Sequence, residues 1–386
     1  MAVPIIYNIR NLRLRPGATV MTVLGVALTV SIAIFIMALL SGLQQAFVTS
    51  GDPLNVLVLR KGADAELLSV IGRDAFDIMK FLPGVARDDQ GEPLASGEMF
   101  VAIVLPRLDG TGEVNVSVRG LTLTGLKLHP KVRLAEGRWF SPGLREIVVS
   151  RSIRKRFAHA NPGDTVQFGK GPWTVVGVFD AAGTAHESEI WADVNQMATD
   201  FDRSIFSSVL LHATDKIAAD ALTHRVNDDQ RLKLQGMLET DYYARQTRSG
   251  APLQFVGTLV AIIMAIGSCF AAMNTMYAAV AYRSREIATL RVLGFSRPSV
   301  LTSFVLESLL IALLGGALAV ALMLPFRDLT TGTSNIVTFT EVVFQIRMTA
   351  GVMIAAMGFA AALGLFGGLA PAWHAARSNI LNSLRD

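Results

Sequence analysis

The sequence is poor in cysteine and in charged residues. Its single cysteine, Cys269, excludes a disulfide framework within one chain. Only 17% of the 386 residues are charged, whereas a soluble domain of this size carries about 25%. The net charge is only +4, and we expect no nucleic-acid partner. Because 51% of the residues are hydrophobic, the composition indicates a membrane protein before any segment is considered.

What the sequence does contain is four long apolar runs. A helix crosses the hydrocarbon core of a lipid bilayer with about 20 mostly apolar residues. Four segments meet this requirement, at 18–41, 252–281, 300–325 and 348–371, and the only charge within them is Glu307. Buried helices of a soluble protein are the alternative, but such helices rarely run past about 20 residues without a charge. The sequence therefore predicts four membrane spans.

The first two runs are expected to continue beyond the lipid. The first is well beyond the roughly 7–15 apolar residues of a signal peptide, so we interpret it as a retained span. The run 252–281 would be about 45 Å long as a helix, which exceeds the hydrocarbon core. We expect its excess to form a stalk, with the first run continuing beside it to about residue 50.

Basic residues are concentrated in three short segments outside the apolar runs. Residues 1–17, the connection 282–299 and the tail 372–386 together hold nine basic and two acidic residues. Short basic segments remain in the cytoplasm. Both termini and the connection are therefore predicted to be cytoplasmic, whereas residues 51–250 and the short loop 326–347 are predicted to be outside.

Residues 51–250 are expected to form a mixed α/β domain. Strand-like patterns occur at 54–59 and 114–118, and 163–180 has two strand-like runs around a Gly-Lys-Gly-Pro turn. Helices are predicted at 65–81 and 217–238. The predicted fold class is thus an α-helical membrane protein of four transmembrane helices, with an α/β extracytoplasmic domain inserted between the first and second.

No catalytic chemistry is evident in this domain. The six histidines are scattered without metal-ligand spacing, and His186, Glu187 and Glu189 are interpreted as a solvated turn rather than a metal site. The string ending in Gly169-Lys170 fails as a phosphate loop, because Gly171 stands where a serine or threonine is needed. We expect no catalytic, cofactor-binding or metal-binding residues and no enzymatic activity of the chain itself.

The connection 282–299 contains a short basic and amphipathic sequence, "YRSREIATLRVLG". On a helical wheel, Ile287, Leu290 and Gly294 fall on one arc, with Arg283 and Arg291 at its edges. One interpretation is an interfacial helix lying on anionic headgroups. The other is a ridge that inserts into a groove on a soluble partner, with the arginines steering an acidic rim.

The segment "AAMNTMYAAVAYRSREIATLRVLGFSRPSVLTSFVLESLLIALLGG" resembles the signature of FtsX-like permeases of the MacB type. That family's run has an Asn near the end of a span, then Arg-x-x-Glu-Ile-x-x-Leu-Arg-x-x-Gly, then a Glu in the next span followed by glycines. The start "NIRNLRLRPGATVMTVLGVALTVSIAIFI", the tail "PAWHAARSNILNSLR" and, more loosely, "GRWF", "REIVVS" and "GDTVQF" are also similar to the family. The matching positions are Asn274, Arg283, Glu286, Ile287, Leu290, Arg291, Gly294, Glu307, Gly315 and Gly316.

The resemblance implies the membrane (permease) subunit of an ABC transporter, located in the bacterial inner membrane with a periplasmic core domain. It implies a cytoplasmic amphipathic helix over 1–17 that leads into the first span, and a homodimer of two permease copies. It also implies a separate ABC ATPase subunit, since the chain starts almost at its first span, and that subunit would hold ATP and Mg while this chain binds no cofactor. The ATPase-contacting coupling helix would comprise Arg283, Arg285, Glu286, Ile287, Leu290, Arg291 and Gly294.

Polar and small residues inside the spans are assigned packing roles. Glu307 lies near the cytoplasmic interface, and we expect it to pair with an arginine of the connection or of the N-terminal segment. Asn274 is expected to hydrogen-bond between helices. Glycines let helices approach closely or form dimer contacts, and the candidates are Gly315, Gly316, Gly364, Gly367 and Gly368.

Two functions remain open from the sequence. In the first, ATP-driven movement below the membrane is carried along the spans to the outer domain (mechanotransmission), for export or efflux of a substrate with a possible HlyD-type periplasmic adaptor. In the second, the chain is a non-transporting FtsX-like regulatory subunit that controls periplasmic partners such as cell-wall hydrolases.

Overall fold

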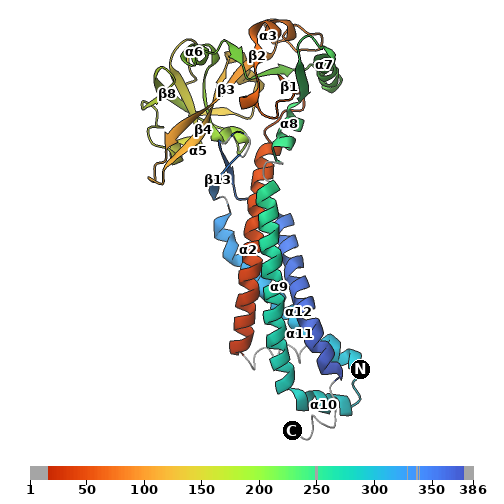
Figure 1. Cartoon of the computed structure of the whole chain (residues 1–386). Helices are drawn as coiled ribbons and strands as arrows, with labels where there is room; N and C mark the ends of the chain where they lie inside the picture. Colours follow the sequence, from red (N-terminus) through yellow and green to blue (C-terminus); the bar gives the residue numbers. More distant parts are fainter. Residues whose placement is uncertain (1–15, 248–250, 328, 336–337, 339, 378–386) are drawn as a thin grey trace. The chain divides into compact units, whose positions relative to one another are not determined.

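The computed structural model describes residues 16–247, 251–327, 329–335, 338 and 340–377 (Figure 1). The predicted helix over 1–17 therefore lies almost wholly outside the described residues. The chain divides into two compact units. The helical unit comprises residues 1–41, 252–329 and 346–386, and the sheet unit comprises residues 42–251 and 330–345.

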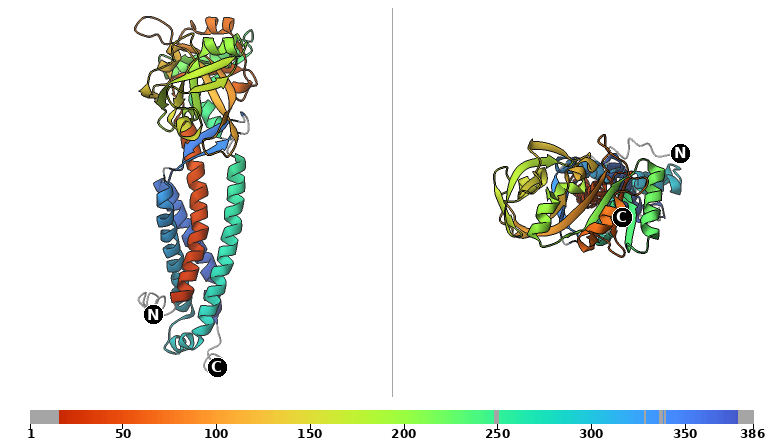
Figure 2. Two further views of the ribbon diagram at one scale, coloured as in Figure 1. Left: turned by 90° about the vertical axis from the view of Figure 1, so that its left-hand side faces the viewer. Right: turned by 90° about the horizontal axis from the view of Figure 1, so that it is seen from above.

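The helical unit contains the four predicted spans. They are α2 (Pro16–Val48), α9 (Ala251–Tyr282), α11 (Arg297–Met323) and α12 (Ala350–Arg377). Each is long and apolar enough to cross a membrane. The first run indeed forms one unbroken helix to Val48, and α12 continues beyond its predicted end at 371 to Arg377. The four helices lie alongside one another in both side views (Figures 1 and 2).

The sheet unit is built on a ten-stranded mixed sheet. Its strand order is β12-β1-β11-β3-β4-β9-β6-β8-β5, and β7 pairs with β8 off this path. The strands are β1 (Asn55–Arg60), β3 (Ala95–Pro106), β4 (Glu113–Leu121), β5 (Arg133–Gly137), β6 (Glu146–Ser150), β7 (Thr165–Phe168), β8 (Gly171–Asp180), β9 (Glu189–Asp193), β11 (Ser208–His212) and β12 (Leu234–Leu238). The pairs β4–β9 and β6–β8 are parallel and the others are antiparallel. The predicted mixed α/β domain is confirmed.

Several short helices and a small two-stranded sheet accompany the main sheet. The helices are η1 (Glu66–Leu68), α3 (Arg73–Met79), α4 (Leu123–Leu128), α5 (Arg151–Arg156), η2 (Ala185–Ser188), α6 (Val194–Asp200), α7 (Lys216–Asp228) and α8 (Glu239–Gln246). The small sheet pairs β2 (Ile71–Gly72) with β10 (Ile205–Phe206). Short strands and short helices thus alternate along the chain in this unit.

The sequence predicted the strands of this unit better than its helices. The hairpin at 163–180 is present as β7 and β8, joined through the two residues Gly169 and Lys170. The helix predicted over 65–81 is wrong, because the chain forms η1 and β2 before α3 begins at Arg73. The helix predicted over 217–238 ends at Asp228, since residues 234–238 instead pair with β1 as an edge strand.

The loop predicted at 326–347 is a β-hairpin that belongs to the sheet unit. Strands β13 (Thr330–Ser334) and β14 (Glu341–Gln345) pair with each other, and Val342, Val343 and Phe344 are buried. The Val343 amide donates to the Ser188 hydroxyl over 2.7 Å. The Glu341 carboxylate accepts from Arg107 at 2.6 Å and from Arg156 at 2.5 Å. The hairpin is therefore fastened to the sheet unit by ion pairs as well as by apolar packing.

Candidate functional site

The connection between α9 and α11 forms the short helix α10 (Ser284–Val292). It lies at the end of the helical unit where α2 begins and α12 ends (Figure 1). Gly294 follows it with φ of +94°, and its amide donates to the Arg291 carbonyl over 3.2 Å. A glycine is favoured here because other L-residues rarely adopt this left-handed conformation. The helix predicted from the sequence is present, and Gly294 ends it.

An ion pair ties the start of α10 to α11. The Arg283 Nη1 atom donates to Glu307 Oε2 over 2.9 Å, and the two side chains are only 7% and 6% exposed. Arg283 precedes the first residue of α10, and Glu307 lies within α11. The expected pairing of Glu307 with an arginine of the connection is therefore confirmed. Because a buried charge is costly without its partner, this pair constrains where α10 can lie against α11.

The apolar side of α10 differs from the predicted ridge. Ile287 is only 2% exposed and packs with Val280 and Phe304 in the helical unit. It is therefore unavailable to a partner in this structure, and the helical wheel was wrong to place it on a docking surface. The wheel failed because it assigns faces without knowing which side the neighbouring spans cover. The side chains of Arg285, Glu286 and Leu290 lie outside the described residues.

The C-terminal end of α10 carries the exposed apolar surface. Val292 is 66% exposed and Leu293 is 68% exposed. Arg291 is partly exposed beside them, and Gly294 is exposed. An exposed apolar pair flanked by a basic side chain is a suitable contact for a groove with an acidic rim.

The span glycines lie where helices approach one another. A Cβ atom on Gly315 would lie 2.8 Å from the Val26 Cβ atom of α2, and one on Gly316 would lie 2.8 Å from the Ala360 Cβ atom of α12. Gly364 and Gly368 of α12 make similarly close approaches to α11, and Gly367 to Ala272 of α9. The predicted role of these glycines in packing of the spans is confirmed within one chain.

Polar contacts between the spans are only partly as predicted. Asn274 is exposed on α9, so it does not lie between helices of this chain as expected. A hydrogen bond that the sequence did not reveal joins α11 to α12, where the Ser308 hydroxyl donates to the Gly364 carbonyl over 2.7 Å. The absence of a side chain at Gly364 gives Ser308 access to this carbonyl.

The sheet unit holds a buried ionic cluster centred on Arg119 of β4. Its guanidinium donates to both oxygens of Glu66 at 2.7 and 2.8 Å and to both oxygens of Glu189 at 2.9 Å. It also donates to Glu98 at 2.6 Å. All four residues are buried. This cluster could not be predicted from sequence spacing, because its members come from η1, β3, β4 and β9.

The cluster sets the charge states of its members. Burial alone would raise the pKa of Glu98, but the nearby Arg119 and His129 outweigh burial and lower this pKa to about 2. Burial is likewise outweighed at Glu189, where Arg119 and His186 hold the pKa well below its usual range. Burial raises the pKa of Glu239 above that of a free carboxyl, and neighbouring histidines only partly offset it. The unit thus favours the ionised forms of Glu98 and Glu189 in its interior, whereas burial favours the neutral form of Glu239.

The interpretation of His186 and Glu189 as a solvated turn is wrong. Both residues are buried, and His186 Nδ1 lies 3.0 Å from Glu189 Oε2. Glu189 also accepts from the Trp191 indole at 2.8 Å. The polar letters of "GTAHESEIW" suggested solvent exposure, but Glu189 bonds to Arg119. Glu187 is partly exposed and accepts from the Ser152 hydroxyl and the Ala181 amide.

Four candidate membrane spans with a mixed α/β domain between the first and second define a multi-span membrane protein with one large inserted domain. Residues 19–229 match the family model of the MacB-like periplasmic core domain, and residues 258–380 match that of the FtsX-like permease C-terminal. The chain therefore belongs to the MacB-type, FtsX-like permease family, the membrane components of ABC transporters. The sheet unit corresponds to its periplasmic core domain.

Relatives of the chain include macrolide export ATP-binding/permease proteins named MacB. The protein of Bordetella avium (strain 197N) is 24% identical over 396 residues, which cover 95% of this chain and 57% of that protein. The protein of Nitrosomonas europaea is 25% identical over 391 residues, which cover 93% of this chain and 55% of that protein. The chain thus spans a little more than half the length of these relatives.

Among solved structures, the periplasmic region of MacB from Actinobacillus actinomycetemcomitans is 13% identical with a TM-score of 0.39. It matches 50% of this chain and 92% of its own length. The extracellular domain of the noncanonic ABC-type transporter YknZ from Gram-positive bacteria is 18% identical with a TM-score of 0.36. It matches 47% of this chain and 99% of its own length.

Proposed function

We propose that the chain couples ATP hydrolysis by a separate cytoplasmic ABC ATPase to movement of its periplasmic domain, for export of a substrate. The chain itself hydrolyses nothing in this scheme, and ATP and Mg bind to the partner. The spans lie in the inner membrane, with both termini and α10 on its cytoplasmic side. The functional unit is a homodimer. A HlyD-type adaptor is a further candidate partner of the periplasmic domain.

The connectivity of the two units is the observation that carries this proposal. The chain passes between the units at four points, after residues 41, 251, 329 and 345. Helix α2 passes through the first point without a break. Strand β13 begins seven residues after the end of α11, and α12 begins five residues after the end of β14. Helices α2, α11 and α12 are thus joined to the sheet unit by helix or by a short connection, so displacement of these spans would act on the sheet unit through the chain itself.

In this proposal the ATPase contacts the chain at the C-terminal end of α10. Arg283 and Glu307 connect α10 to α11, and Ile287 packs it against neighbouring spans. A force applied to α10 by a partner would therefore act on the spans rather than on a loose loop. The exposed Val292 and Leu293 are the proposed contact with the ATPase.

The test co-expresses the full chain with a candidate ABC ATPase of the same organism and purifies the complex. Val292→Asp and Leu293→Asp introduce a charge at the proposed contact, and we expect each to lower ATP hydrolysis of the complex at least tenfold or to abolish its assembly. Ile217→Asp is the matched control, since Ile217 is 83% exposed in the sheet unit. Full assembly and hydrolysis in both α10 variants would show that the ATPase binds elsewhere.

Transport and regulation are separated by a second measurement on a deletion strain. Export predicts accumulation of a compound in the cells or sensitivity to it, with unchanged wall hydrolysis. A change in wall hydrolysis without any change in compound accumulation would instead establish the FtsX-like regulatory function.

A further inference from the structure

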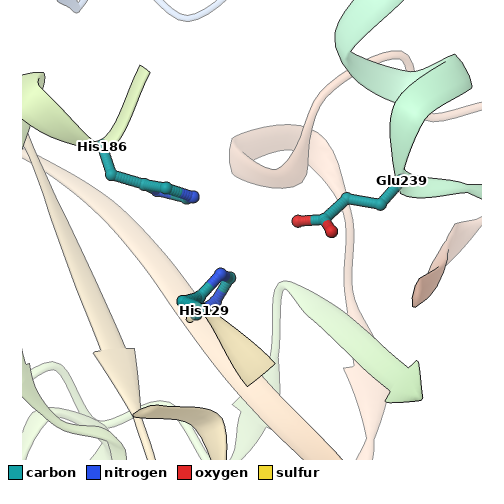
Figure 3. A group of neighbouring side chains, drawn as sticks. All are labelled: His129, His186 and Glu239. Atoms are coloured by element: carbon teal, nitrogen blue, oxygen red, sulfur yellow. The ribbon is translucent and has the colours of Figure 1, made fainter. Parts of the chain in front are cut away.

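Three buried side chains from distant parts of the sequence converge in the sheet unit. His129 follows α4, His186 lies in η2, and Glu239 begins α8 (Figure 3). One nitrogen of each histidine and one carboxylate oxygen lie within 4.8 Å of one another. Figure 3 shows the Glu239 carboxylate directed toward the two imidazole rings. These atoms are the donor types that zinc and related divalent ions bind in proteins.

Each histidine is held by a carboxylate on its other nitrogen. His129 Nε2 lies 3.3 Å from Glu98 Oε1, and His186 Nδ1 lies 3.0 Å from Glu189 Oε2. This leaves His129 Nδ1 and His186 Nε2 as the nitrogens that can bind an ion. Metal-binding histidines commonly carry such a carboxylate partner, which fixes the ring and raises its basicity.

The third donor is also fixed in place. Glu239 Oε2 accepts from the Asp52 amide and from the Asn55 side-chain amide, each over 2.9 Å. Its Oε1 atom thus remains available for an ion. The Tyr243 hydroxyl lies 3.5 Å from His186 Nε2, so it also borders the three donors.

The charges around the three donors favour a cation. The buried acidic residues are Glu66, Glu98, Glu189 and Glu239, and the buried guanidinium among them is Arg119. Four acidic side chains thus surround one guanidinium and two histidines. A divalent ion would offset an excess of negative charge, whereas uncompensated charge is costly in a protein interior.

We propose that His129, His186 and Glu239 bind one divalent transition-metal ion of the zinc class. At zinc–ligand distances of about 2.0–2.1 Å, tetrahedral ligand atoms lie about 3.4 Å apart. Closing from separations of up to 4.8 Å requires side-chain movements on the order of 1 Å. The bound ion would join α4, η2 and α8, and α8 is the last helix of the sheet unit before α9. This proposal departs from the sequence-based expectation of no metal.

The test measures metal binding by the full chain purified in detergent. The protein is stripped with a chelator and titrated with Co²⁺, whose visible absorption reports four-coordinate nitrogen and oxygen ligation, and the Zn²⁺ content is measured after dialysis. We expect saturable binding of about one ion per chain and a higher unfolding midpoint with metal. His186→Gln and Glu239→Gln should each weaken binding at least a hundredfold, while the exposed His224→Gln should bind as the unchanged chain does.

If the ligand variants do not fold, the unchanged chain alone still tests whether the histidines bind the metal. X-ray absorption of the zinc-loaded chain should then show two imidazole nitrogens on the metal. A chelated chain that takes up no stoichiometric Co²⁺ or Zn²⁺ would overturn the proposal and leave protonated histidines as the compensating charges. Folded ligand variants that bind as tightly as the unchanged chain would overturn it equally.

Discussion

Arg283 and Glu307 form a buried ion pair of 2.9 Å between the residue before α10 and the middle of α11. Removal of one partner leaves the other charge buried and uncompensated, at a cost of about 3–5 kcal/mol. We therefore expect Glu307→Gln or Arg283→Gln to lower the thermal unfolding midpoint of the detergent-solubilised chain markedly, while the double variant recovers part of the loss.

Arg297→Gln is the control for this pair, because Arg297 is exposed at the start of α11. Unfolding midpoints for the two single variants equal to that of Arg297→Gln would show that the pair contributes nothing to stability.

Two glycines of α12 provide a matched test of helix packing. A Cβ atom on Gly364 would lie 2.6 Å from the Ala312 Cβ atom and 3.0 Å from the Leu309 backbone, whereas one on Gly358 would have nothing within 4 Å. Gly364→Ala should destabilise the chain by about 1–3 kcal/mol through overpacking. Gly358→Ala should be neutral or stabilising by up to about 1 kcal/mol, because alanine is the better helix former. Thermal unfolding of the two variants in one detergent distinguishes them, and equal midpoints would contradict the close approach of α11 and α12.

The Glu341 carboxylate fastens the 330–345 hairpin to the sheet unit. Glu341→Gln removes the negative charge and so weakens the contacts with both Arg107 and Arg156. We expect this change to lower the free energy of unfolding by about 1–3 kcal/mol. Limited proteolysis should then cut within residues 327–347 at least several times faster. Glu113→Gln, at an exposed position of β4, is the control. An unchanged cleavage rate in Glu341→Gln would show that apolar packing alone holds the hairpin.

The pair of Arg138 and Glu146 predicts a pH-dependent contribution to stability. The hydrogen bond from Arg138 lowers the pKa of Glu146 to about 2, with further help from the Ser141 amide, although burial opposes the shift. A lowered carboxyl pKa stabilises the fold above the unfolded value, near 4.5, and this contribution disappears as the pH falls toward 2. Glu146→Gln should thus cost about 1 kcal/mol at neutral pH, since Arg138 is largely solvent-exposed.

At low pH, Glu146→Gln should leave the free energy of unfolding almost unchanged. Unfolding midpoints of the unchanged chain and of Glu146→Gln are therefore expected to converge between about pH 5 and pH 2. If the unfolding midpoints of the two proteins differed by the same amount across this pH range, Glu146 would not titrate in it.

The membrane spans and their basic connection could be predicted because they depend on local composition. Long apolar runs predict α2, α9, α11 and α12. The position of the single charge Glu307 within its run predicts an arginine partner, and the structure shows this partner to be Arg283. The burial of Ile287 could not be predicted in this way, because it depends on which neighbouring spans cover α10.

The buried polar interior of the sheet unit was missed for a related reason. Arg119 meets Glu66, Glu98 and Glu189 through strand pairing and chain reversals that one-dimensional spacing does not record. His129 and His186 are 57 residues apart in sequence, yet their ring centroids are 4.8 Å apart. Sequence patterns identify buried apolar positions well, but a polar residue with buried partners looks the same in sequence as one facing solvent.

The assignment of 330–345 to the sheet unit changes how this protein must be dissected. A domain cut at residues 42 and 251 would lack two strands, leave Arg107 and Arg156 without Glu341, and expose the surface that Val343 covers. An isolated periplasmic domain, or a chimera with a relative, should therefore carry the distal hairpin as well, attached by a designed linker or transplanted in the same exchange.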